Sequence, residues 1–150
     1  MRVVIQRVSS ASVTIDGKIS GEISQGFLIL LGIEAADTAD DVDWLSGKIS
    51  KMRVFADPAG LMNHSLADIN GSALVVSQFT LHANVRKGNR PSFTRAARPE
   101  QAEPLYMAFL QQLGDRISKP CQSGEFGADM QVSLVNDGPV TIIIDSKNRE

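Results

Sequence analysis

Residues 3–33 read VVIQRVSSASVTIDGKISGEISQGFLILLGI, and this stretch decides the fold. Val3 to Ile15 is rich in β-branched residues, and apolar and polar side chains alternate near its end, which is typical of a strand. Asp16-Gly17 is a strong two-residue hairpin signal, and Lys18 to Ser24 returns as the partner strand. Phe27 to Ile33 is continuously apolar, as a fully buried strand would be. The stretch therefore predicts three consecutive strands.

Two helices are predicted further along the chain. In the first, apolar side chains recur at spacings of three and four from Val42 to Met52, and Thr38 or Asp37 can cap its start. Acidic residues near its beginning and lysines near its end complement the helix dipole. The second helix is expected over Glu103–Leu113, with one apolar face.

The remaining strands are short and separated by turn signals. They are expected at Arg53–Ala56, Ala73–Leu81, Met130–Val135 and Val140–Asp145, with a hairpin turn at Asn136–Pro139 between the last two. Because strands dominate and two helices are inserted among them, the pattern predicts an α+β fold. Its helices would pack on a mostly antiparallel sheet or partly closed barrel, in a single domain over residues 1–150.

The bulk composition excludes several classes of protein. The single cysteine, Cys121, permits no intrachain disulfide, and with only His64 and His82 beside it no closed zinc site is expected. We expect no cofactor. The apolar run at the N-terminus is too short for a signal peptide, and Phe27–Ile33 is far too short to span a membrane. These features favour a cytoplasmic protein.

A local excess of positive charge contrasts with the net charge of −2. The segment from His82 to Arg98 carries five cations and no acidic residue, and its length and glycine and proline content predict a loop. It is either a solvated loop or a phosphate clamp, with Phe93 buttressing the loop or stacking on a base. The cations are Arg86, Lys87, Arg90, Arg95 and Arg98.

Three further segments have a structural and a functional interpretation. Ser77–Leu81 is either a strand emerging into solvent or a strand end whose polar groups line a pocket. Asn136–Thr141 is either a simple turn or carries a cis Gly138-Pro139 bond whose two carbonyls point the same way and grip an ammonium group. Gly124–Met130 is either a packed loop or a base-stacking platform. None of the common catalytic signatures is present.

Taken together, these segments resemble the D-aminoacyl-tRNA deacylase family. The motifs Ser-Gln-Phe-Thr-Leu at 77–81 and Asn-Asp-Gly-Pro-Val-Thr at 136–141 match its two signatures. The opening residues 1–8, the loop at 86–93 and the segment 124–130 are similar to the family as well, so the resemblance extends to about Ser146.

The resemblance implies a hydrolase that removes D-amino acids, and glycine, from tRNA. It implies a homodimer with an active site at each subunit interface, no membrane contact and no other protein partner. Gly138-Pro139 would be a cis dipeptide that reaches into the partner's pocket, where its carbonyls bind the substrate ammonium. Its main chain would fill the space that an L side chain needs, and glycine would escape this steric filter.

Two mechanisms are consistent with the resemblance. Thr80 is either a nucleophile that forms an acyl-enzyme, or it offers its backbone N–H to the ester carbonyl while the 2′-hydroxyl of the terminal adenosine activates water. We favour the second. The other implied roles are pocket-shaping by Ser77, Gln78 and Phe79, adenosine contacts by Phe126 and Met130, anchoring of the pocket by Arg7, and tRNA binding by Arg86, Lys87 and Arg90.

Two rival functions remain open at this point. The basic loop also suits a nucleic-acid-binding module without catalytic activity. A different small esterase with the same fold would cleave substrates that lack the tRNA body.

Overall fold

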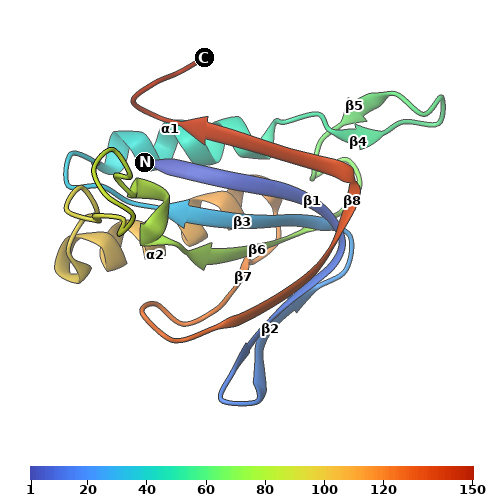
Figure 1. The fold of residues 1–150 in the computed structure, drawn as a ribbon. Coiled ribbons are helices and arrows are strands. Elements are labelled where there is room, and N and C mark those ends of the chain that lie inside the picture. Colours follow the sequence, from blue (N-terminus) through green and yellow to red (C-terminus); the bar gives the residue numbers. More distant parts are fainter.

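The computed structural model describes all 150 residues (Figure 1). Six strands form one sheet, two short strands form a separate hairpin, and two α-helices cover one face of the sheet. The strands are β1 (Arg2–Ile15), β2 (Lys18–Ile23), β3 (Gly26–Gly32), β4 (Phe55–Ala56), β5 (Met62–His64), β6 (Ser72–Ser77), β7 (Gln122–Ser123) and β8 (Gln131–Asp145). The helices are α1 (Ala39–Ser50), α2 (Pro99–Ile117) and the 3-10 helix η1 (Phe79–His82).

Strand β1 organises the sheet because it pairs along both edges. One edge pairs antiparallel with β3 through residues 2–8 and with β2 through residues 11–15, and the other edge pairs antiparallel with β8. The hairpin between β1 and β2 turns at Asp16 and Gly17, both at positive φ, as the sequence predicts. β3 then pairs in parallel with β6, and β6 with β7.

The sheet curls until it almost closes. β2, at one end of the strand order, comes back beside β7 at the other end, where the Ser20 hydroxyl donates to the Ser123 carbonyl at 3.4 Å. A Cβ atom placed on Gly21 would lie 2.7 Å from the same carbonyl, so only glycine permits this approach. The result is the partly closed α+β barrel expected from the sequence, although its sheet is mixed.

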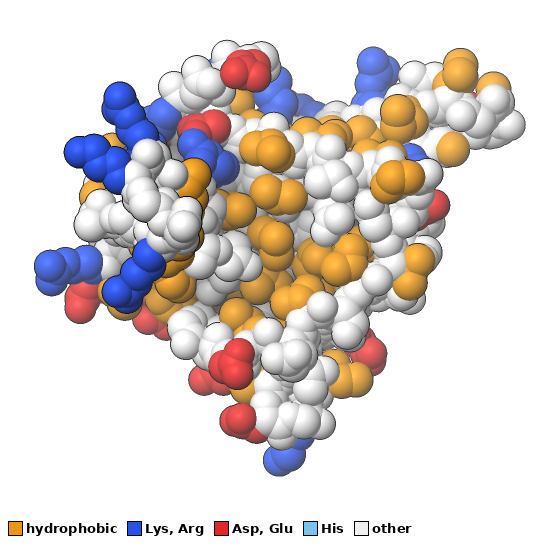
Figure 2. Space-filling view, in the orientation of Figure 1, with side chains coloured by type: hydrophobic (Ala, Val, Ile, Leu, Met, Phe, Trp, Pro, Cys, Tyr) orange, Lys and Arg blue, Asp and Glu red, His pale blue; other side chains and the backbone are white.

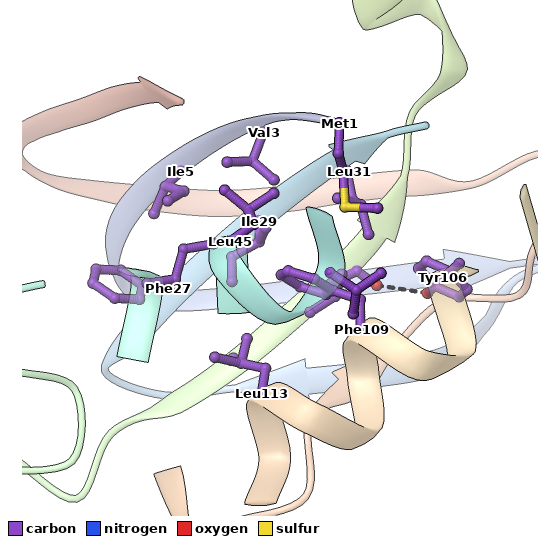
Figure 3. Close-up of a cluster of buried hydrophobic side chains, with 14 of the residues drawn as sticks. Met1, Val3, Ile5, Phe27, Ile29, Leu31, Leu45, Tyr106, Phe109 and Leu113 are labelled. Atoms are coloured by element: carbon purple, nitrogen blue, oxygen red, sulfur yellow. Dashed lines mark hydrogen bonds between the residues drawn. The ribbon is translucent and has the colours of Figure 1, made fainter. Parts of the chain in front are cut away.

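The main core lies between the sheet and the two helices (Figure 3). Alternate side chains of β1 and β3, such as Val3 and Ile29, point toward Leu45 of α1 and Phe109 of α2. Tyr106 is buried in this cluster and donates a hydrogen bond to the Val75 carbonyl at 2.9 Å. Neither α1 nor α2 combines the length and apolarity that crossing a bilayer requires.

Helix α1 begins where the sequence predicts. Thr38 is its N-cap, and the Asp41 carboxylate accepts from the Thr38 backbone N–H at 2.9 Å, which completes a capping box. Asp41 is buried and also accepts from the Ser146 hydroxyl and from the Lys147 ammonium. This carboxylate therefore joins the start of α1 to the end of β8.

Several predicted boundaries are wrong. The strand expected at Ala73–Leu81 ends at Ser77, because the chain turns there into η1. The strand expected at Arg53–Ala56 is reduced to Phe55–Ala56, and the second helix extends over Pro99–Ile117. β5 and β7 were not predicted, since two or three residues give no periodic signal.

The hairpin turn predicted at Asn136–Pro139 is also wrong. This segment lies within the single strand β8, whose two halves both pair with β1 and not with each other. The register shifts on either side of Val8, which accommodates the extra residues as a bulge. The Gly138-Pro139 bond is cis.

Candidate functional site

A pocket of about 580 Å³ lies at the carboxyl ends of β3 and β6. Its walls are mostly apolar, and they come from the ends of these strands, from the start of η1, from residues 93, 96–99 and 102, and from residues 126–128, 130 and 132. Ser77, Gln78 and Phe79 lie in this wall, as do Phe126 and Met130, which face them from the segment before β8. The structure thus brings together the Ser77–Leu81 motif and the Gly124–Met130 segment, as the functional interpretation of each requires.

Aromatic contacts fix two sides of the pocket. Phe79 meets Phe93 edge to face, with ring centroids 5.2 Å apart, although the Phe79 side chain stays 57% exposed. Phe126 packs on Tyr106 at 5.8 Å. Burial raises the pKa of Tyr106 to about 12, so its phenol stays protonated as a hydrogen-bond donor. Phe93 buttresses the loop in which it lies, and Phe126 is both packed and available to the pocket.

The polar groups of the motif sit at the rim. The Gln78 amide nitrogen donates to the Thr80 hydroxyl oxygen at 2.6 Å, and this is the only hydrogen bond that the Thr80 side chain makes. Thr80 itself is not part of the pocket wall. The backbone N–H groups of Phe79 and Thr80 open η1, where helix geometry offers them no acceptor.

His82 follows the motif residues directly and is buried. Its side chain is buried, with 1% of the residue exposed, and neither ring nitrogen has a hydrogen-bond partner. It packs beside Gly32 and forms no hydrogen bond with the Thr80 hydroxyl. No histidine or carboxylate is therefore hydrogen-bonded to Thr80 as a general base.

The cationic loop, residues 83–98, follows η1 and borders the pocket. Arg86, Lys87 and Arg90 are exposed and form no ion pair. Arg95 differs, because its guanidinium binds the buried Glu34 carboxylate at 2.9 Å. Figure 2 shows the lysine and arginine side chains gathered on this side of the molecule.

Arg7 lies at the other end of the sheet. Its Nη1 donates to the Val54 carbonyl at 2.6 Å and its Nε donates to the Asp137 carbonyl at 3.1 Å, and Nε also lies 3.4 Å from the Asp137 carboxylate. A Cβ on Gly138 would lie 3.0 Å from Arg7 Nη2, so the guanidinium packs directly against this dipeptide. Arg7 thus holds the Gly138-Pro139 segment, which is exposed.

The strand register separates this second cluster from the pocket. Arg2 of β1 lies opposite Gly32 at the pocket end of β3, whereas Arg7 lies opposite Phe27 at the far end. Five residues of strand span about 17 Å. Arg7, Gly138 and Pro139 are therefore not in the pocket of their own chain, although Ser77, Gln78 and Phe79 are.

Sequence reasoning missed part of the pocket wall. Ala96, Ala97 and Ala102 line it and carry no polar group that a motif search would detect. Glu34 was missed as well, and it fixes the end of the cationic loop through Arg95 and through a bridge to Ala96. Its only signal in the sequence is an acidic residue directly after a buried strand.

Fold and site together define a class: a small α+β protein with an apolar pocket, main-chain donors at its rim and a cationic loop beside it. A comparison with known families identifies the class. The model of the D-Tyr-tRNA(Tyr) deacylase family matches residues 4–145. The chain belongs to this family and is an enzyme of it, which confirms the resemblance seen in the sequence.

Individual relatives agree with this assignment. The D-aminoacyl-tRNA deacylase of Opitutus terrae is 62% identical and that of Flavobacterium johnsoniae 57% identical, each over the full length of both chains. The solved structure of a c-Myc DNA unwinding element binding protein is 44% identical, with a TM-score of 0.90 and coverage of 97% of this chain and 98% of that one. A probable eukaryotic D-amino acid tRNA deacylase shares the fold, at 17% identity, a TM-score of 0.82 and coverage of 95% and 97%.

Proposed function

We propose that the protein hydrolyses the ester bond of D-aminoacyl-tRNA and of glycyl-tRNA, releasing the free amino acid and tRNA. The observation that carries this proposal is the pocket at the Ser77–Thr80 motif in a member of this family. Its apolar walls and aromatic side chains suit the terminal adenosine, and the main-chain donors at its rim suit an ester carbonyl.

The active site is completed by a second copy of the chain. The Gly138-Pro139 segment is exposed and lies at the opposite end of the sheet from the pocket of its own chain. The two motifs form one site if the Gly138-Pro139 segment of each chain enters the partner's pocket in a homodimer. The separation of the two motifs within one chain supports this arrangement.

The main chain of the Gly138-Pro139 segment reads the chirality of the substrate. Its carbonyls accept hydrogen bonds from the α-ammonium group, and its atoms occupy the space that an L side chain needs. A D side chain points away and is left free, so one site accepts many amino acids. Glycine has no side chain to exclude, and glycyl-tRNA is therefore cleaved.

Hydrolysis proceeds by positioning and not through an acyl-enzyme. The Thr80 hydroxyl accepts from Gln78 and has no base beside it, which supports a role for the backbone N–H groups of Phe79 and Thr80. These donors bind the ester carbonyl as it gains negative charge. The 2′-hydroxyl of the terminal ribose then assists the attacking water.

The tRNA backbone is held by three of the free cations of the cationic loop. Arg86, Lys87 and Arg90 are exposed and unpaired, which supports contacts with phosphates near the 3′ end. Arg95 is engaged with Glu34 and fixes the loop itself.

Purified protein incubated with D-tyrosyl-, L-tyrosyl- and glycyl-tRNA in the presence of a chelator tests the function. We expect rapid loss of the D-tyrosyl and glycyl esters and survival of the L-tyrosyl ester. Cleavage of none of the three would overturn the proposal. Equal cleavage of D-tyrosyl adenosine and D-tyrosyl-tRNA would instead identify a small-molecule esterase.

A nucleic-acid-binding role without catalysis is the second candidate. The relative at 44% identity is named for binding a DNA unwinding element, and the free cations of the loop are compatible with such a role. Gly138→Ala separates the two functions, since a pure binder does not use this position. We expect the variant to keep its affinity for tRNA and to lose hydrolysis.

A further inference from the structure

The hairpin of β4 and β5, residues 55–64, projects from the body of the molecule (Figure 1). We call it the arm. It forms a separate two-stranded sheet and carries two large apolar side chains in solvent, Leu61 and Met62, which are 61% and 55% exposed. Exposed apolar side chains on a projecting element favour a contact surface over a solvated loop.

The arm is held in a defined shape by Asp57. One carboxylate oxygen accepts from the backbone N–H groups of Ala59 and Leu61, both at 2.9 Å, and the other accepts from the Asn63 side chain at 2.8 Å. An ordered element loses little conformational entropy when it packs against a partner. The internal bonding therefore favours a role in binding.

Arg7 connects the arm to the Gly138-Pro139 segment. Its guanidinium donates both to the Val54 carbonyl, one residue before the arm, and to the Asp137 carbonyl. One side chain therefore joins the base of the arm to the Gly138-Pro139 segment. If the Gly138-Pro139 segment enters a partner subunit, the base of the arm reaches that subunit as well.

The face of the sheet opposite the helices is open and apolar. Ile143 of β8, Val4 of β1 and Leu30 of β3 lie opposite one another in register, and Ile143 is 69% exposed. Figure 2 shows hydrophobic side chains across the middle of this face, with the cationic loop at one side and the arm at the other.

The side of this face that bears the pocket also carries exposed apolar side chains. Phe79, Val85 and Phe93 are 57%, 69% and 36% exposed. They belong to η1 and the cationic loop, and none of them is covered by the arm of its own chain, which lies on the opposite side.

The entry of each Gly138-Pro139 segment into the partner's pocket requires a two-fold axis that lies between the two open faces and runs across the line from arm to pocket. Rotation by half a turn places the arm side of one subunit over the pocket side of the other, and it does so twice. We propose that the arm of each subunit packs, through Leu61 and Met62, on the apolar side chains of η1 and the cationic loop of its partner. This inference rests on the homodimer of the proposed function.

The contact gives the arm a role in substrate binding. The arm packs against the outer side of the partner's cationic loop. The conformation of the loop at each active site therefore depends on both subunits. The contact also places a second segment of the partner, besides Gly138-Pro139, at the edge of each pocket.

Photocrosslinking tests the arm directly. Benzoylphenylalanine is placed at Leu61 or at Met62, and subunits labelled with ¹⁵N are mixed with unlabelled ones before irradiation. Mass spectrometry then identifies the joined peptides and shows whether they come from different subunits. The matched control carries the probe at Met107 of α2, a methionine with the same exposure of 55%.

We expect probes at Leu61 and Met62 to join peptides of residues 79–93 between differently labelled subunits, and the Met107 probe not to do so. A dimer by light scattering whose arm probes react only within their own chain, or elsewhere on the partner, overturns the arm contact and leaves the dimer standing. A monomer overturns both the contact and the cross-subunit active site.

Discussion

The Thr80 hydroxyl would be the nucleophile of a covalent mechanism, and its surroundings do not activate it. It accepts a hydrogen bond from Gln78, and the buried ring of His82 is not bonded to it. A threonine nucleophile needs a base within hydrogen-bond reach. The backbone of this residue is therefore the better candidate for a catalytic role than its side chain.

Thr80→Ala tests this assignment because it removes the hydroxyl and keeps the backbone N–H. We expect hydrolysis of D-tyrosyl-tRNA to stay within about tenfold of the original rate in single-turnover measurements. Loss of a true nucleophile costs about 10⁴-fold or more. A loss of that size in Thr80→Ala, with full activity in Thr80→Ser, would contradict a backbone role.

Arg7 is a positioning residue, since its guanidinium donates hydrogen bonds to two carbonyl groups that belong to different segments. Arg7→Lys keeps the charge, but an ammonium group cannot reproduce the planar fork of the guanidinium. We expect the rate with D-tyrosyl-tRNA to fall by about tenfold, the cost of one charged hydrogen bond. The ratio of D to L cleavage should fall with it, and an unchanged ratio would show that Arg7 does not position the chiral filter.

At the scale of elements, the cationic loop divides into anchored and free charges. Arg95 is fixed by Glu34, whereas Arg86, Lys87, Arg90 and Arg98 form no ion pair. Replacing Arg86, Lys87 and Arg90 together by glutamine should raise KM for D-tyrosyl-tRNA and leave kcat nearly unchanged. The slope of log KM against log salt should decrease by about 0.7–0.9 for each lost phosphate contact.

Lys18→Gln is the matched control for this experiment. Lys18 is also exposed, but it lies at the β1–β2 hairpin, away from the pocket. Its removal should leave both KM and its salt dependence unchanged. If Lys18→Gln and the triple variant behave alike, the loop has no specific part in tRNA binding.

Elements with a strong local signal could be predicted from the sequence. The Asp16-Gly17 turn and the capping box at Thr38 are set by adjacent residues, so the β1–β2 hairpin and the start of α1 were correct. The segment Asn136–Pro139 has an equally strong turn signal, yet long-range pairing of β8 with β1 overrides it. The residues of the segment alone give no indication that it pairs with β1.

The candidate site was predictable in its parts but not in its arrangement. The motif at Ser77 and the segment at Phe126 could each be singled out as pocket-forming, and the structure brings them together. The position of Gly138-Pro139 at the opposite end of the sheet depends on the register of β1 with β3 and β8. No pattern in a single strand encodes this register.

At the scale of the whole molecule, the Asp41 carboxylate joins the start of α1 to the end of β8. Its burial alone would raise its pKa, but hydrogen bonds from Lys147, Ser146 and the Thr38 backbone outweigh that effect and hold the pKa well below the ordinary value of 3.8. A lowered pKa contributes stability that is present above the unfolded value and is lost as pH falls through the folded value. Stability should therefore decline below about pH 4.

Asp41→Asn tests this contribution. The variant should lose about 2 kcal/mol of unfolding free energy at pH 7, or roughly 4–8 °C in Tm, and the difference should shrink as pH falls from 4 to 2. Asp40→Asn is the control, because Asp40 is exposed in the same helical turn. A difference between Asp41→Asn and the unmodified protein that does not depend on pH would show that the carboxylate charge is not responsible.

The proposed homodimer, in which the Gly138-Pro139 segment of one chain serves the pocket of the other, makes a prediction about mixed dimers. Gly138→Ala displaces the segment, because φ is +128° and the new Cβ would press on Arg7 Nη2 and on Val140 at 3.0 Å. Ala128→Trp fills the pocket from a surface loop. Each variant alone should lack hydrolysis of D-tyrosyl-tRNA.

In a mixed dimer, however, the intact pocket of the Gly138→Ala chain meets the intact segment of the Ala128→Trp chain. Random exchange makes half of the dimers mixed, with one intact site in two, so about a quarter of the original activity should return. If each segment served its own pocket, mixing would restore nothing.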